Sequence, residues 1–87
     1  MDNIAVAGTL ESNDCLITVK KIKGRKIVID SIVFEQFGKE IEKTIIKVLD
    51  DANINDIFVN IVDKGALDYT IIARLKTALK RLGEEIA

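Results

Sequence analysis

CLITVKKIKGRKIVI, residues 15–29, predicts β-structure and so limits the folds open to this chain. In its first half, Cys15, Ile17 and Val19 alternate with other side chains, two of them polar. That alternation is the two-residue period of a half-buried strand. We expect Cys15 to be a small buried apolar residue with no catalytic role.

A short connection at residues 23–25 separates the two halves of this stretch. Gly24 supplies the positive φ that tight turns often need, and β-branched residues resume directly after it. The sequence therefore predicts a hairpin between strands at about 15–22 and 26–30. Five basic residues surround the turn: Lys20, Lys21, Lys23, Arg25 and Lys26. They suit a solvated tip that protects a sheet edge from aggregation, and a site that steers an anionic group or an acidic partner is the alternative.

Two further strands and two helices complete the predicted elements. A short run of small and β-branched residues predicts a strand at about 4–10, and a segment apolar on both faces predicts an interior strand at about 57–62. Apolar spacings of three and four predict helices at about 32–52 and 66–82. The core-facing residues are expected to be Phe34, Phe37, Ile41, Ile45, Val48 and Ala52 in the first helix and Ile71, Leu75, Ala78 and Leu82 in the second.

Polar residues and a glycine mark the expected helix ends. We expect the Ser31 hydroxyl to cap the first helix and the Asp63 carboxylate to cap the second. Asp68 would then add a favourable negative charge in the first turn of the second helix. Gly83 is expected to end that helix.

The elements together predict an α+β fold. Two helices would cover one face of a small mixed or antiparallel sheet in a two-layer sandwich. We expect one domain over residues 1–87, because a chain of this length with 48% apolar residues builds one compact core.

Composition excludes several classes of function. Thirteen basic and 14 acidic residues nearly cancel, so the charge favours neither nucleic acid nor an anionic membrane as partner. No signal peptide or membrane-spanning run is evident, and we expect a cytoplasmic protein. The absence of histidine excludes serine–histidine and cysteine–histidine nucleophiles and imidazole metal ligands. We expect no catalytic residue and no metal site.

Ser12 stands out within AVAGTLESND, residues 5–14. Gly8 removes side-chain bulk beside it, Asn13 tolerates left-handed backbone geometry, and Asp14 can hydrogen-bond nearby backbone. These residues predict an accessible serine at a corner between two strands. The same composition is also typical of an ordinary turn.

Three segments carry a family resemblance: AVAGTLESND, FGKEI at 37–41 and VDKGALDYTIIARLKTAL at 62–79. Together the chain resembles the acyl carrier protein, or gamma chain, of citrate lyase. The resemblance implies that Ser12 carries a phosphoribosyl-dephospho-coenzyme A group through a phosphodiester. It also implies that the thiol of this group bears acetyl and citryl thioesters while citrate is cleaved to acetate and oxaloacetate.

The resemblance further implies a non-catalytic carrier subunit. Its expected partners are the transferase (alpha) and lyase (beta) subunits of citrate lyase and a prosthetic-group transferase. The residues expected to support the loop or to dock on partners are Gly8, Glu11, Asp14, Asp63, Lys64 and Gly65. Val62 departs from the pattern, since an aspartate is expected there.

Alternatives remain open at this point. The acyl carrier of malonate decarboxylase has a related sequence and the same type of prosthetic group, and an unmodified protein-binding module would need Ser12 only as a turn residue. Asp30-Ser31-Ile32 also resembles the attachment signature of fatty-acid-type carriers. Those carriers are all-helical, which the β-branched stretch 15–29 does not fit.

Overall fold

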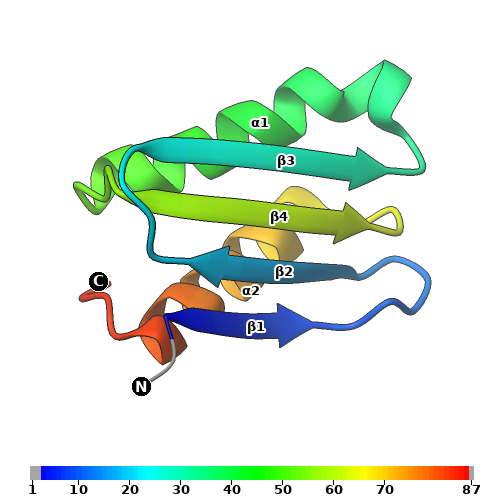
Figure 1. The fold of residues 1–87 in the computed structure, drawn as a ribbon. Helices are drawn as coiled ribbons and strands as arrows, with labels where there is room; N and C mark the ends of the chain where they lie inside the picture. Colours follow the sequence, from blue (N-terminus) through cyan, green and yellow to red (C-terminus); the bar gives the residue numbers. More distant parts are fainter. Residues whose placement is uncertain (1–2, 87) are drawn as a thin grey trace.

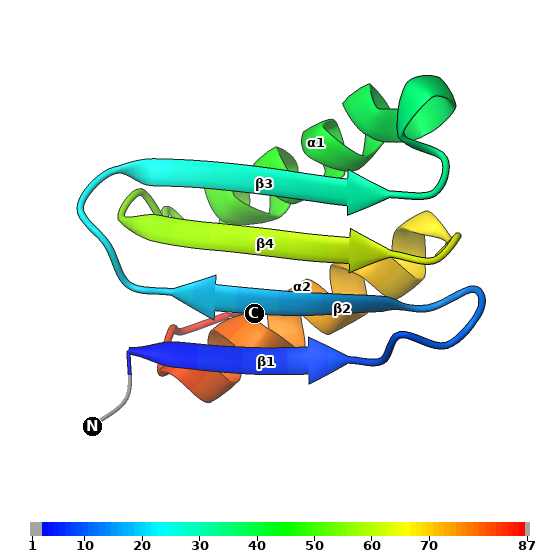
Figure 2. The ribbon, with the colours of Figure 1, turned by 45° about the vertical axis from the view of Figure 1, so that its right-hand side comes forward.

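The computed structural model describes residues 3–86 as one sheet backed by two helices (Figure 1). The elements are β1 (Ile4–Gly8), β2 (Cys15–Lys20), β3 (Arg25–Ser31), α1 (Phe34–Asp51), β4 (Ile57–Asp63) and α2 (Asp68–Leu82). Both helices lie behind the same face of the sheet in the two views (Figures 1 and 2). The predicted α+β two-layer fold is confirmed. No helix within residues 3–86 is both long enough and apolar enough to cross a membrane.

The strand order is β1-β2-β4-β3, which makes the predicted hairpin wrong. β4 lies between β2 and β3, antiparallel to the first and parallel to the second. The physical reason is that β4 is apolar on both faces and therefore takes an interior place, as predicted. Gly24 keeps its expected positive φ, but its carbonyl accepts a hydrogen bond from Ile57 N, at the start of β4.

The core lies between the sheet and the helices. Cys15, Ile17 and Val19 point into it with no exposed surface, which confirms the predicted alternation and the buried thiol. Ile41, Ile45 and Val48 of α1 are buried on the helix side. The predicted stripe of α2 is also confirmed: Ile71, Leu75, Ala78 and Leu82 are buried.

Phe34 and Phe37 were expected in the core, and that expectation is wrong. Their side chains are 52% and 51% exposed. The first turns of α1 lie beside the end of the edge strand β3, so only the later turns reach over the sheet (Figure 1). The Phe34 ring instead covers Gly38, where an added Cβ would lie 2.7 Å from the ring.

The two expected helix caps are also wrong in detail. α1 begins after Val33 and α2 after Leu67, each without a side-chain cap. Ser31 Oγ accepts a hydrogen bond from Val33 N (3.1 Å) and donates one to Asp63 Oδ2 (2.7 Å). Ser31 and Asp63 are the last residues of their strands, so they brace the connections before the helices. Asp68 in the first turn of α2 and the left-handed Gly83 at its end are confirmed.

Candidate attachment site

The β1–β2, β3–α1 and β4–α2 connections meet at one end of the sheet, where the strands β1, β3 and β4 finish, on the right in Figures 1 and 2. The β1–β2 connection contains Ser12 and lies directly against the β4–α2 connection. Asn13 N donates to Lys64 O (2.8 Å), and Lys64 N donates to Asp14 O (2.9 Å). Two of the segments that carry the family resemblance are therefore hydrogen-bonded to each other.

Backbone geometry gives the Ser12 turn a defined shape. Gly8 has φ +101°, and a Cβ there would lie 1.9 Å from the Cys15 carbonyl oxygen, so no other residue fits without distortion. Asn13 has φ 67°, which confirms the predicted left-handed conformation. Asp14 N closes the turn by donating to Glu11 O (3.1 Å).

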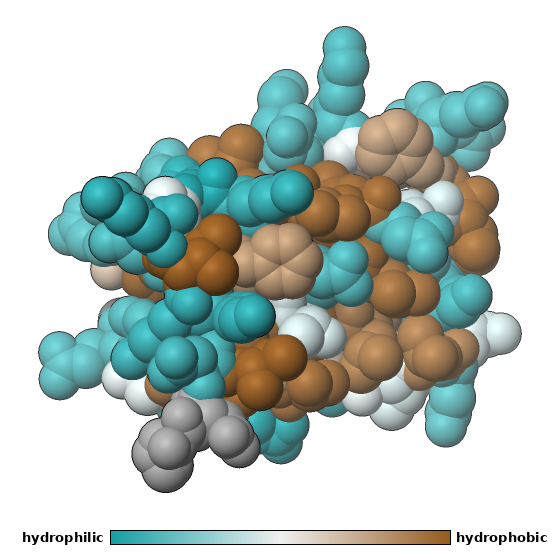
Figure 3. Space-filling model, in the orientation of Figure 1, coloured by the Kyte–Doolittle hydropathy of each residue, from teal (hydrophilic) through white to brown (hydrophobic). Residues whose placement is uncertain are grey.

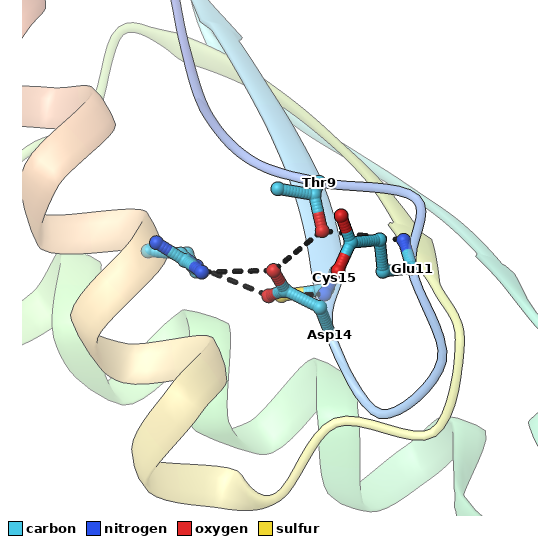
Figure 4. A network of polar contacts seen from close by, with 5 residues as sticks. Thr9, Glu11, Asp14 and Cys15 are labelled. Atoms are coloured by element: carbon cyan, nitrogen blue, oxygen red, sulfur yellow. Dashed lines mark hydrogen bonds and ion pairs between the residues drawn. The ribbon is translucent and has the colours of Figure 1, made fainter.

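Asp14 ties this turn to helix α2 (Figure 4). Arg74 of α2 grips the carboxylate with two hydrogen bonds, from Nε–H to Oδ1 (3.0 Å) and from Nη2–H to Oδ2 (2.8 Å). Thr9 Oγ1 donates to Oδ2 (2.7 Å), and Cys15 N donates to Oδ1 (2.7 Å). Thr9 Oγ1 also accepts from Glu11 N (3.2 Å). One carboxylate therefore connects both sides of the loop to the helix.

The electrostatics of this network keep its charges in place. The hydrogen bonds from Arg74 and Thr9 hold the pKa of the Asp14 carboxyl well below its usual range. Asp14 in turn raises the pKa of Arg74. Burial, together with the nearby carboxylates of Asp14 and Asp63, raises the pKa of the Cys15 thiol to about 12. Cys15 is thus a neutral thiol at physiological pH, without the thiolate that a nucleophile needs.

Ser12 lies at the tip of this turn and is exposed. Its hydroxyl has no hydrogen-bond partner among residues 3–86, and no histidine exists to act as its base. An unactivated alcohol of this kind cannot attack a substrate by itself, but another enzyme can reach and modify it. Within the described part of the chain, no cluster of three or more carboxylate or cysteine side chains could hold a metal ion.

The structure brings the sequence-predicted site residues together at this end of the sheet. Gly8, Glu11 and Asp14 lie in or beside the Ser12 turn, while Lys64 and Gly65 form the connection it touches. The Glu11 side chain points to solvent, whereas Asp63 is only 1% exposed and serves the neighbouring connections. Their role in docking stays a prediction.

Two other candidates are placed differently. Ser31 lies at the same end of the sheet as Ser12, but its hydroxyl donates a hydrogen bond to Asp63, which favours a structural role. The basic cluster surrounds the β2–β3 connection, at the opposite end of the sheet from Ser12. Within that cluster, Arg25 is already paired with Asp50 (2.9 Å) and donates to Ile54 O (2.6 Å).

Sequence reasoning missed Arg74 and Thr9. Thr9 offered no signal beyond its place in the turn. Arg74 lies within residues 62–79, one of the segments that carry the family resemblance. It stands next to the buried stripe of α2, where a cation can reach the end of the sheet. Its partner is 60 residues away in the chain, which no local pattern reveals.

Comparisons with known proteins show the family of this chain. Residues 2–82 match the family described as malonate decarboxylase delta subunit (MdcD). The citrate lyase acyl carrier protein of Fusobacterium nucleatum is 44% identical over 86 residues, which cover 97% of this chain and 92% of that protein. The citrate lyase acyl carrier protein of Treponema denticola is 44% identical over 81 residues, 93% of each chain. This chain therefore belongs to the acyl carrier family that includes the citrate lyase gamma chain and the malonate decarboxylase delta subunit.

Proposed function

We propose that this protein is the acyl carrier subunit of citrate lyase, with Ser12 as the attachment point of its prosthetic group. The observation that carries the proposal is the Ser12 hydroxyl itself, exposed at the tip of a turn whose backbone is held on both sides. The identity to citrate lyase acyl carrier proteins over nearly the whole chain supports the assignment.

The residues around Ser12 fit a large covalent group. The hydroxyl is free of competing hydrogen bonds within residues 3–86, and Ser12 is exposed at the end of the sheet rather than buried in the core. A phosphoribosyl-dephospho-coenzyme A group would supply a thiol that carries acetyl and citryl thioesters. This chain would hold the group at a fixed point and present it to other subunits.

The chemistry would then belong to the partners. Cys15 is a buried neutral thiol and therefore supplies no nucleophile. The chain has no histidine that could act as a base. We propose transferase and lyase subunits as the acting partners and a separate transferase that loads Ser12. A tether keeps its cargo at an effective concentration on the order of millimolar, which replaces diffusion between two active sites.

A second candidate is the carrier of malonate decarboxylase, because the matching family is described by that enzyme's delta subunit. The two candidates share the carrier role and the type of arm. They are separated by the partner that the loaded protein serves: restoration of citrate cleavage by carrier-depleted citrate lyase supports the first, and restoration of malonate decarboxylation alone supports the second.

Mass spectrometry tests the attachment. The chain is produced together with the prosthetic-group transferase, its intact mass is measured, and the modified residue is located by fragmentation. We expect one added group on Ser12, none in Ser12→Ala, and normal loading in Ser31→Ala as the matched control. Modification at Ser31, or an unchanged mass in the wild type, would contradict the proposal, and the unchanged mass would favour an unmodified binding module.

A further inference from the structure

A groove of about 610 Å³ opens beside the Ser12 turn. Phe37 and Ile41 of α1 line one side, and Gly65, Leu67 and Tyr69 line the other. It therefore lies between the start of α1 and the connection that leads from β4 into α2.

The groove and the Ser12 turn share a wall. Lys64 exchanges backbone hydrogen bonds with Asn13 (2.8 Å) and Asp14 (2.9 Å), and the next residue, Gly65, lines the groove. A Cβ at Gly65 would lie 3.6 Å from Asn13 Oδ1. A group attached to Ser12 therefore starts one residue away from the groove wall.

The rim of the groove exposes large apolar side chains. Tyr69 is 71% exposed, Leu67 58% and Phe37 51%. Of the other exposed apolar residues, Leu10 and Ile32 belong to the connections at the same end of the sheet, and Phe34 is the first residue of α1. On the face of the sheet that the helices leave uncovered, Figure 3 shows more apolar residues toward this end, while polar residues dominate the opposite end. A concentration of this kind marks a binding surface, whereas single exposed apolar residues do not.

The charges of the groove restrict what can enter it. Its charged lining residues are all acidic: Glu40, Asp63 and Asp68. Within residues 3–86, no lysine or arginine lines it, so the phosphates of a nucleotide would be repelled rather than held. A neutral flat ring is favoured, because aromatic side chains stack on nucleobases.

We infer that the groove binds the adenine base of the prosthetic arm on Ser12, with the rings of Phe37 and Tyr69 stacked against it. This inference rests on the proposed function, since it requires a nucleotide-containing arm at Ser12. The adenine is near the attached end of a phosphoribosyl-dephospho-coenzyme A group, as the groove is near Ser12. The diphosphate would then leave the acidic rim toward solvent, and the thiol end would swing from that point.

Tyrosine fluorescence provides the readout. Tyr69 is the only tyrosine and the chain has no tryptophan, so the signal comes from the groove rim alone. We expect the fluorescence to fall when the arm is attached. It should stay low after nucleotide pyrophosphatase cuts the diphosphate and releases the pantetheine half, with both states verified by mass.

Matched variants assign the effect to the groove. Phe37 lines it, whereas Phe34 is equally exposed on the same turns of α1 and does not. In the loaded protein we expect Phe37→Ala to restore the fluorescence and Phe34→Ala to leave it low. Equal effects of the two variants would overturn the inference.

The remaining outcomes separate failure of the adenine site from failure of the carrier function. Unchanged fluorescence in a protein whose mass shows the full arm, or recovery once the pantetheine half is removed, overturns the adenine site and leaves the carrier function standing. A protein that accepts no arm contradicts the proposed function and the adenine site with it.

Discussion

Replacing Asp14 by alanine should destabilise the whole domain, although Asp14 lies in a connecting loop. Its side chain is only 14% exposed and accepts hydrogen bonds from Arg74, Thr9 and the Cys15 amide. A hydrogen bond to a charged group contributes roughly 1.5–3 kcal/mol, while exposed ion pairs contribute less. We therefore expect a loss of about 2 kcal/mol, which corresponds to roughly 8–16 °C in Tm for a domain of this size.

Thermal and urea unfolding, followed by far-ultraviolet circular dichroism, measure the loss. Asp30→Ala is the matched control, because Asp30 is exposed and makes no side-chain hydrogen bond among residues 3–86. The control should stay within about 0.5 kcal/mol of the wild type. If Asp14→Ala and Asp30→Ala have the same Tm and urea midpoint, the Asp14 carboxylate does not hold the turn and the prediction is wrong.

The pH dependence of stability, compared between Asp14→Asn and the wild type, gives an independent check. Arg74 and Thr9 lower the pKa of folded Asp14, whereas the pKa of an unfolded aspartate is about 3.9. The contribution of Asp14 is therefore present above about pH 5 and is lost as the pH falls toward the folded pKa. Asp14→Asn should lose less stability than the wild type between about pH 5 and pH 3. Parallel pH profiles would show that the ion pair is not formed in solution.

Three further predictions concern residues in or beside the Ser12 turn. Gly8→Ala should lower the free energy of unfolding by about 2 kcal/mol or more, because the backbone has φ +101° and the new Cβ would clash with the Cys15 carbonyl. A urea midpoint equal to that of the wild type would contradict this prediction. Ser12→Ala should change the free energy of unfolding by no more than about 0.5 kcal/mol, since the side chain is exposed, and a large drop in Tm would show a structural role. The Cys15 thiol should react with a thiol reagent only after unfolding, because it is buried with a pKa of about 12; prompt labelling of the native protein would refute this.

Local patterns identified most of the individual elements. The alternation from Cys15 to Val19 located a strand and its buried face, and the spacing from Ile71 to Leu82 located a helix and its core stripe. The composition around Ser12 also indicated an exposed turn between strands. These features were predictable because each depends on side chains within a few residues of one another.

The arrangement of those elements required contacts between distant parts of the chain. β4 inserts between β2 and β3, where side chains of two neighbouring strands flank both of its apolar faces, so the expected hairpin does not form. Phe34 and Phe37 continue the apolar spacing of α1, yet the start of that helix lies at the margin of the sheet and leaves them exposed.

The candidate site also has one part that local sequence predicted and one part that it did not. Ser12 and its turn were evident from neighbouring residues and from the family resemblance, whereas the Arg74 grip on Asp14 joins positions 60 residues apart. Periodicity reports which side of a segment avoids water, but it does not report which other segment will cover that side. Which segments pack against each other depends on how all the apolar faces are buried in one small core, and that burial exists only in the folded molecule.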